Sequence, residues 1–218
     1  MPNQQHLSLI GEAIEKHDST IWNKWRQENP DIRPDLTDAQ FSRTDLRGMN
    51  LTKTNLRGAD LRETDLRGAD LCGTNLKRAD LKKAALNGVI FRDANLRGAD
   101  LSYTDLSGSD LDNANLTRAN FRAANLAGAK FHGANLSEAI LGEANLCEAD
   151  FSCALLLGAL LLGADLNGAN LEDSVKNLSP SQIRTAKNWQ VAYFCKDILE
   201  ALGLPPDHNE SLRRKSEE

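Results

Sequence analysis

The chain has 218 residues, a net charge of -5 and 40% apolar residues, enough to form a core. The charge is small and of the wrong sign for a general nucleic-acid binder. No apolar run approaches the ~18 residues of a membrane span, and the first residues lack the basic start and apolar stretch of a signal peptide. We therefore expect a cytoplasmic protein that binds neither nucleic acid nor a membrane.

The sequence contains none of the motifs that would indicate an enzyme or a metal centre. Its four cysteines form no CxxC pair and its histidines do not cluster, which disfavours both a disulfide scaffold and a zinc site. No P-loop, nucleophile elbow or dinucleotide fingerprint occurs either. We predict no catalytic residue, no metal and no cofactor.

Residues 1–33 are predicted to form one or two helices, ending near Asn29-Pro30. Asp18 or Ser19 fits an N-cap, and an apolar face is formed by Ile14, Ile21, Trp22 and Trp25. A tryptophan-lined binding site is one interpretation of this face. A cap is favoured, because the open end of the region that follows would expose unpaired backbone and core leucines.

Residues 34–173 repeat every five residues without a slip. From Leu36 to Leu171 there are 28 repeat positions, of which 23 are Leu and 5 are Phe. The residue two before is Ala, Ser or Thr in 25 of the 28, and the residue between them is Asp or Asn in 21. Residues two apart in an extended segment point the same way, so the small residue and the Leu face inward and the polar residue faces out.

The remaining two residues of each unit must turn the chain, and Gly occupies the second of them in 12 repeats. Each unit is then one short side and one corner of a β-helix. The "LRG" and Thr motifs alternate every ten residues in the first half, and an even number of sides stacks like on like. Four sides per coil predicts seven coils of 20 residues, or roughly 34 Å at the usual spacing of paired strands.

One side is expected to be irregular. Met49 and Val89 occupy inward positions that are otherwise small, and Val89, Ile90 and Phe91 crowd one side. These residues predict a bulge or local widening at "GVIF", residues 88–91.

The units "ANLRGADL" (94–101) and "ANLTRANF" (114–121) resemble those of the pentapeptide-repeat family. The resemblance implies an all-β solenoid, a right-handed quadrilateral β-helix of about seven coils, here with α-helical caps at both ends. It also implies that the outward Asp and Asn side chains bind backbone amides at the corners and are not a metal or general-acid site.

Residues 174–206 are predicted to contain one C-terminal helix. Ser179 fits its N-cap, Pro180 its first position, and Gln182 can complete a capping box. The helix would run to Leu202 and stop at Gly203. Residues 207–218 are polar and are expected to form a disordered tail.

Large aliphatic residues replace polar ones near the end of the repeat, and they form the candidate interaction or helix-docking patch Ile140, Leu155, Leu157, Leu160 and Leu162. Soluble monomers rarely leave such a cluster bare. We expect the C-terminal helix to fold over it, because the helix follows within ten residues; otherwise the patch is a partner or dimer interface. A monomer is favoured over a dimer.

These features favour a non-catalytic protein-protein interaction module, a regulatory or adaptor protein whose protein partner is unidentified. The alternative comes from the resemblance, because some pentapeptide-repeat proteins protect DNA gyrase by presenting an acidic rod that mimics DNA. Residues 101–173 hold 3 basic and 10 acidic side chains, against 12 basic and 10 acidic in residues 34–100. The second half would be the acidic surface of such a mimic.

Overall fold

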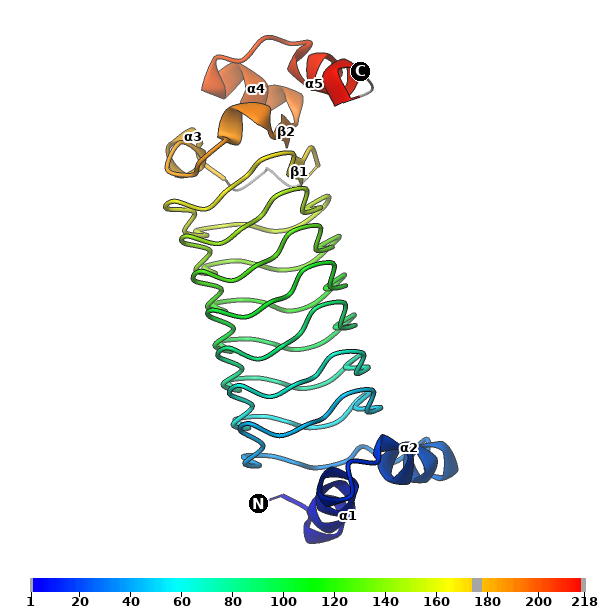
Figure 1. The fold of residues 1–218 in the computed structure, drawn as a ribbon. Coiled ribbons are helices and arrows are strands. Elements are labelled where there is room, and N and C mark those ends of the chain that lie inside the picture. The colour runs from blue at the N-terminus through cyan, green and yellow to red at the C-terminus, as the bar shows by residue number, and fades with distance from the viewer. Residues whose placement is uncertain (1, 174–177, 217–218) are drawn as a thin grey trace.

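The computed structural model describes residues 2–173 and 178–216 as a straight stack of coils with helices at both ends (Figure 1). Two helices precede the coils: α1 (Gln4–Glu15) and α2 (Ser19–Glu28). The stack ends at β1 (Asn170–Leu171). It is followed by α3 (Pro180–Ile183), the 3-10 helix η1 (Trp189–Val191), β2 (Tyr193–Phe194), α4 (Lys196–Leu202) and α5 (His208–Ser216).

Each coil contains 20 residues and four sides, as predicted. Parallel bridges join every outward residue to the one twenty later, from Asp35 with Asn55 through to Asp150 with Asn170. We number the sides by their outward residues: face 1 starts at residue 35, face 2 at 40, face 3 at 45 and face 4 at 50, and coil one is residues 35–54. Two bonds join neighbouring coils on a face: the Leu36 amide donates to the Asn55 carbonyl, and the Asn55 amide donates to the Pro34 carbonyl, both at 2.8 Å.

Every corner from residue 38 to residue 168 turns through a residue with positive φ, and twelve of these are glycine. The amide that follows each such residue donates back to a Leu or Phe carbonyl in most units, as Ala39 does to Leu36 at 3.1 Å. This is the geometry of a turn that favours glycine at its third position. The other fifteen corners place a side chain in the same region, including Tyr103 (φ 60) and Ala123 (φ 54), so the repeat forces a conformation that most of these residues disfavour.

The inward Leu and Phe side chains form one continuous core. Leu96 and Leu116, one coil apart, are both 0% exposed, and Phe131 and Phe151 stack with ring centroids 4.7 Å apart. Inward threonines are tolerated because their hydroxyls are bonded: Thr74 Oγ1 donates to the Leu51 carbonyl at 2.7 Å.

The bulge predicted at residues 88–91 is wrong. Ile90 bridges both Asp70 and Asp110, and the Phe91 amide bonds the Asp110 carbonyl at 2.7 Å, as in the regular coils. Val89 is completely buried and stacks between Ala69 and Ser109, at the same inward position one coil before and one coil after it. Because both of these neighbours are small, the extra volume of Val89 fits without displacing the backbone.

The outward Asp and Asn side chains bind corner amides, as the family resemblance implied. Asp45 Oδ1 accepts from the Arg47 amide at 3.1 Å, and Asp70 Oδ1 accepts from the Cys72 amide at 3.0 Å. Asparagines also bond along the stack, where Asn75 Nδ2 donates to Asn55 Oδ1 at 2.9 Å. These carboxylates and amides therefore hold the turns together.

At the N-terminal end, α1 and α2 bind the backbone of the first coil through side chains. The Asp35 amide donates to His6 Nδ1 at 3.0 Å, and Trp22 Nε1 donates to the Asn50 carbonyl at 2.7 Å. Asn23 Oδ1 accepts from the Asn50 amide at 2.7 Å. The capping role expected of residues 1–33 stays a prediction, and these contacts on faces 1 and 4 support it.

The prediction of one continuous C-terminal helix from Ser179 to Leu202 is wrong, although its end is confirmed, because α4 ends at Leu202 with Gly203 as its C-cap. The capping box of Ser179 and Gln182 forms, but α3 has only four residues. Lys187 then bridges Asp165, and β2 pairs in parallel with β1, so the chain adds part of an eighth coil. Backbone pairing with the open edge of coil seven overrides the local helix signal. Residues 174–177 of this predicted segment lie outside the described residues.

The predicted disordered tail is also wrong over most of its length, because α5 covers His208–Ser216. Arg213 reaches back to Glu172 at 2.7 Å. His208 is 7% exposed, and its Nε2 lies 3.1 Å from the Ala192 carbonyl. Such contacts with the last coils compensate for the low apolar content of the segment. The last two residues lie outside the described range.

Candidate interaction surface

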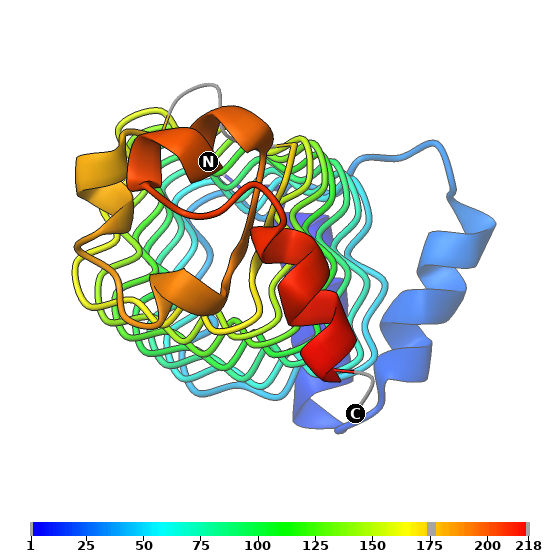
Figure 2. The same cartoon turned by 90° about the horizontal axis from the view of Figure 1, so that it is seen from above.

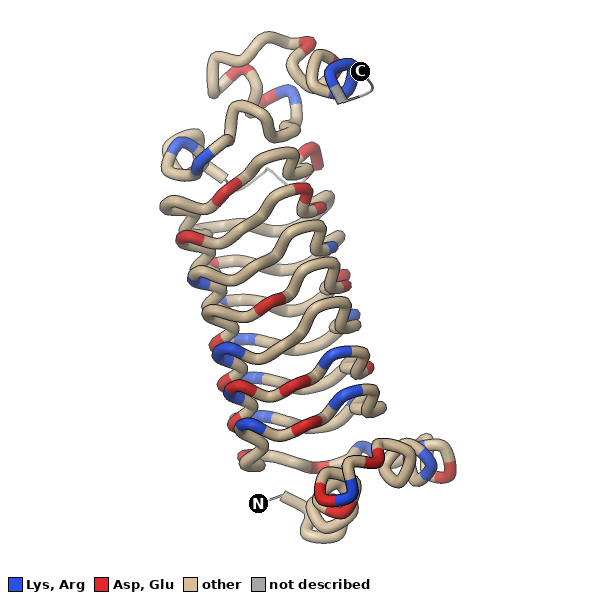
Figure 3. The backbone as a smooth tube through the Cα atoms, viewed as in Figure 1, with Lys and Arg blue, Asp and Glu red and all other residues tan. Residues whose placement is uncertain are grey.

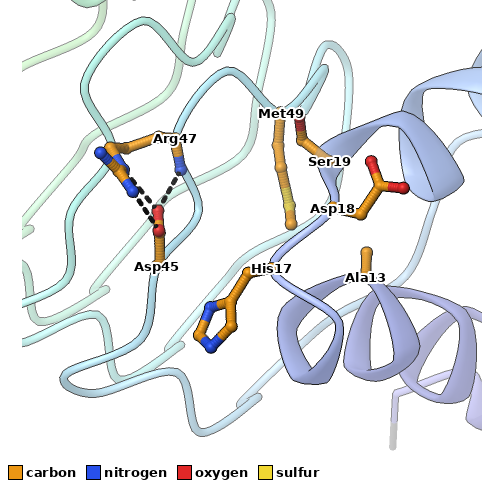
Figure 4. Close-up of a pocket in the computed structure, with 7 residues that line it drawn as sticks. All are labelled: Ala13, His17, Asp18, Ser19, Asp45, Arg47 and Met49. Carbon is orange, nitrogen blue, oxygen red and sulfur yellow. Dashed lines mark hydrogen bonds and ion pairs between the residues drawn. The ribbon is translucent and has the colours of Figure 1, made fainter.

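A cavity lies at the junction of the N-terminal helices and the first coil, lined by Ala13, His17, Asp18, Ser19, Asp45, Arg47 and Met49. It has a volume of about 230 Å³, and Figure 4 shows Asp45 and Arg47 on one side of it and His17 on the other. The Arg47 guanidinium donates to both Asp45 oxygens, at 2.9 and 2.7 Å. This bond is the main reason that the pKa of Asp45 falls to about 2. The one guanidinium in the cavity is therefore already neutralised.

One corner brings together residue types found in hydrolases, in a different arrangement. His132 Nδ1 lies 3.0 Å from Ser152 Oγ, and both side chains are on the surface. Asp112 Oδ1 accepts from the backbone amide of His132 at 3.0 Å. A carboxylate that orients a catalytic histidine bonds the ring instead. The contact is a hydrogen bond between stacked corner residues.

The described residues contain neither a cluster of metal-binding side chains nor a membrane-spanning helix. Within residues 2–173 and 178–216, no group of three His, Cys, Asp or Glu side chains could hold a metal ion. Over the same stretches, no helix is both long enough and apolar enough to cross a membrane.

The patch Ile140, Leu155, Leu157, Leu160 and Leu162 lies on the surface. Leu162 is 71% exposed, Leu157 56% and Leu160 55%. The prediction that the C-terminal helix covers this patch is wrong. The helix α3 lies beyond the last coil at the end of the stack, where Gln182 Nε2 donates to the Ala159 carbonyl at 2.8 Å. The C-terminal segment is held at the open backbone edge of coil seven, which leaves faces 1 and 2 of that coil uncovered.

A group of cations on the corner between faces 1 and 2 has no carboxylate partner among the residues that the structure describes, which the sequence alone did not reveal. Arg57, Lys77, Arg78 and Arg97 stack there on coils two to four, and within the described residues none of them forms an ion pair. On the next two corners, by contrast, Arg62 pairs with Asp60 at 2.6 Å, and Arg67 pairs with Asp65.

The residue before each leucine explains this difference. In "DLR" the Asp carboxylate binds the Arg two residues later, at two points for both Arg62 and Arg67. In "NLR" (55–57 and 95–97) and "NLK" (75–77) an uncharged Asn takes that place. The choice of Asn or Asp was therefore the sequence signal that could have identified the unpaired cations.

Charge is distributed unevenly along the stack. Figure 3 shows Lys and Arg gathered in the coils nearer the N-terminus. Several of the basic residues there are neutralised, such as Arg43 by Glu63 at 3.0 Å. In the second half Arg118 and Arg122 pair with Glu138 and Glu143. This leaves the remaining acidic residues of the second half in excess.

The chain is a repeat protein, in which the stacked five-residue units of residues 34–173 form a regular backbone that carries the surface side chains. A family model for pentapeptide repeats matches the chain with eight copies, over residues 39–78, 74–113, 105–142, 114–152 and 139–175. These segments together span more than half of the chain, which therefore belongs to the pentapeptide-repeat family. Proteins of this family form right-handed quadrilateral β-helices. No curated protein matches the chain.

Solved structures of pentapeptide-repeat proteins resemble the chain, with TM-scores below 0.5. HetL of the cyanobacterium Nostoc sp. strain PCC 7120, which is involved in heterocyst differentiation regulation, is 27% identical, covers 78% of this chain and 90% of its own, and has a TM-score of 0.49. QnrB1, a plasmid-mediated fluoroquinolone resistance protein, is 20% identical over 76% of this chain and 93% of its own, at 0.41. A thylakoid-lumen protein of Arabidopsis thaliana is 35% identical over 50% and 69%, at 0.27.

Proposed function

We propose that the protein is a non-catalytic interaction module that binds a protein partner through the aliphatic patch of coils six and seven. The observation that carries this proposal is the exposure of Leu155, Leu157, Leu160 and Leu162 together on one side of the stack, between 45% and 71%. Polar residues occupy most of the other outward and corner positions of the repeat, so the core does not require these leucines. An exposed apolar cluster of this kind is typical of a protein interface.

The rigidity of the scaffold supports this role. The leucines project from a backbone in which each face is tied to its neighbours by paired hydrogen bonds, such as Leu136 amide to Leu155 carbonyl at 2.7 Å. A partner that binds here meets a surface already in its bound form, which lowers the entropic cost of association.

The test is capture of partner proteins by the immobilised chain, compared with a Leu160→Lys variant. Partners that bind through the patch should be lost from the variant by at least tenfold, because a buried unpaired ammonium is costly. Ile90→Lys is the matched control, since Ile90 is 41% exposed on face 4, away from the patch. Equal capture by Leu160→Lys and wild type would contradict the proposal.

The excess of acidic residues in the second half supports the alternative function, an acidic DNA mimic that binds or protects DNA gyrase. Residues 101–173 hold 10 acidic and 3 basic side chains. A mimic should inhibit gyrase supercoiling in vitro or protect it from a quinolone, and replacing several of these acids by amides should abolish the effect. If the wild-type chain does neither, the alternative is wrong.

A further inference from the structure

The unpaired cations and the aliphatic patch lie on the same edge of the stack. Two parallel columns run along it. The corner column is Thr37, Arg57, Lys77, Arg97, Thr117, Ser137 and Leu157, and the face 2 column is Gln40, Asp60, Asp80, Asp100, Asn120, Ile140 and Leu160. In every coil the two members are three residues apart.

The two columns match one another coil by coil. Cations stand beside carboxylates in coils two to four, polar residues beside polar residues in coils one and five, and Leu157 beside Leu160 in coil seven. Coil six is mixed, with Ser137 beside Ile140. Each of the three carboxylates in the face 2 column has a cation of its own chain nearby: Arg62 lies 2.6 Å from Asp60 and 3.7 Å from Asp80, and Lys82 lies 3.4 Å from Asp100. The two longer pairs leave the Asp80 side chain 42% exposed and that of Asp100 32% exposed, against 14% for Asp60.

We propose that the partner of this surface is a second copy of the chain, lying parallel to the first. A two-fold axis that runs along the stack between the two columns sets the corner column of each copy against the face 2 column of the other. Lys77 then faces the partner's Asp80, and Arg97 faces the partner's Asp100. Each pairing occurs twice, because the contact is isologous. The inference rests on the proposed function and specifies its partner.

The sequence around the axis in coil seven has the symmetry that such a contact requires. Residues 155–162 read "LLLGALLL", the same in both directions except at the central pair Gly158-Ala159. The axis sets Leu157 against the partner's Leu160, and the reverse. Leu155 on face 1 and Leu162 on the corner between faces 2 and 3 flank this pair, so no charged residue borders it in coil seven.

The remaining columns agree with this arrangement. The columns that flank the contact are Asn75, Asn95 and Asn115 on one side and Lys82, Ser102 and Arg122 on the other, so no charge of the same sign is placed opposite them. Arg78 lies next to the axis, close to Arg78 of the partner subunit. We expect its long side chain to turn away from that second cation and toward a face 2 carboxylate.

The size of the contact requires both parts of the edge. The largest apolar patches on monomers measure about 300–600 Å², whereas a stable interface buries about 800 Å² per partner. A patch of that size is too small by itself, so a stable contact also requires the paired columns of coils two to five. The edge is free of α2, which binds Asn50 on face 4, across the stack from face 2, and lies to one side in the end-on view of Figure 2. The contact of α1 with face 1 is at Asp35 in coil one, below the charged pairs of coils two to four.

The test uses two complementary charge reversals in the full chain. Lys77→Asp with Arg97→Asp makes the corner column acidic, and Asp80→Lys with Asp100→Lys makes the face 2 column basic. Each variant alone should repel its own copy, so that the dimer dissociation constant measured by sedimentation rises at least tenfold. Mixed in equal amounts, they should form a heterodimer, because every opposed pair is again of opposite charge.

Three further measurements make the result decisive. Lys53→Asp with Lys130→Asp, which applies the same charge change on and beside face 4, should dimerise like wild type, and Leu157→Lys should be monomeric. Lys130 already occupies an outward position with its bridges intact, so Lys at positions 80 and 100 is expected to fold; an unchanged circular dichroism spectrum checks this. A wild-type chain that is monomeric up to about 100 μM, or reversals that do not rescue each other, would overturn the second-copy proposal. A monomeric wild type that still captures other proteins through Leu160 would leave the proposed function standing.

Discussion

The two ends of the stack satisfy their exposed backbone by different means. At the N-terminal end, side chains of separate helices make most of these bonds: His6, Trp22 and Asn23 bond the main chain of Asp35 and Asn50. The Asn3 amide adds one main-chain bond to the Asp35 carbonyl at 3.0 Å. At the C-terminal end the main chain itself continues, with the Lys187 amide bonding the Ala164 carbonyl at 2.7 Å and the Tyr193 amide bonding Ala169 at 2.9 Å.

The difference shows how far the five-residue rule extends. After coil seven the spacing between bridged residues grows from twenty to 22 and then 23, as in Asp165 with Lys187 and Asn170 with Tyr193. Yet Ala192 and Phe194 are still buried at the small and large inward positions. The eighth coil keeps the inward positions of the repeat but not its twenty-residue spacing. The N-terminal helices keep neither feature and bind the first coil mainly through side chains.

The largest expected effect is at neither end. Leu96→Asp in coil four should bury an unpaired carboxylate and cost more than about 4 kcal/mol of unfolding free energy. Because each coil contacts only its neighbours, the loss should disrupt the stack on both sides of the lesion. Hydrogen exchange should rise in coils three to five first. A soluble variant with unchanged melting would contradict the proposed packing.

Phe194→Ala should be the next largest, at about 3–5 kcal/mol of local stability, because it empties a fully enclosed position in the eighth coil. Phe194 is 1% exposed. Exchange should increase in α3 to α4 and coil seven while coils one to four stay protected. Equal loss of protection in coil one would show that the ends are coupled, against the one-dimensional view of the stack.

Trp22→Phe tests the side-chain contacts of the N-terminal end. The change keeps an aromatic ring and removes the Nε1 donor to the Asn50 carbonyl, and should cost about 1–3 kcal/mol by leaving a buried acceptor unpaired. Trp25→Phe is the control, since Trp25 packs beside Trp22 with ring centroids 5.3 Å apart. Chemical denaturation of the two variants should separate the hydrogen bond from ring size; equal losses would show that only packing matters.

A pair of neighbouring corners measures the backbone strain that all coils share. Ala123 has a φ of 54 and Gly128 a φ of 63, and a Cβ added at Gly128 meets nothing within 4 Å. Ala123→Gly should stabilise by about 0.5 kcal/mol, and Gly128→Ala should destabilise by about 1 kcal/mol. Thermal melting of both variants checks the opposite signs. Shifts in the same direction would mean that φ strain does not decide these corners.

The smallest effect distinguishes the electrostatics of the two ends. An arginine hydrogen bond holds the pKa of Asp45 near the N-terminal end at about 2, whereas a hydrogen bond from the uncharged Asn188 is the main cause that lowers the pKa of Asp165 near the C-terminal end. Both pKa values lie below the unfolded value, so each contribution to stability is present above about pH 4 and is lost as the pH falls through the folded pKa. Titration by NMR in high salt should raise the pKa of Asp45 more than that of Asp165, because salt screens the charged partner. Equal shifts would contradict this assignment.

The candidate surface was only partly predictable from the chain. The aliphatic patch could be named residue by residue, because Leu155 and Leu160 break the polar outward pattern. The sequence could not predict whether the patch is covered, because this depends on where the residues after Leu178 bind the backbone of coil seven. The unpaired corner cations were readable in principle from "NLR" against "DLR", but only the structure shows that Arg62 and Arg67 bond the preceding Asp at two points.

The sequence by itself determined the repeat: its period, its inward leucines and its twenty-residue coil all follow from side chains that alternate in and out at fixed spacing. It also indicated one or two N-terminal helices ending near Asn29, because the cap at Asp18 and the apolar face are local signals; the structure forms two. Only the tertiary structure decided the fate of residues 180–194. There the capping box at Ser179 favours a helix, but the unpaired edge of Asp165 and Asn170 is a stronger partner for the main chain than a few further helical turns, and that edge exists only once seven coils have stacked.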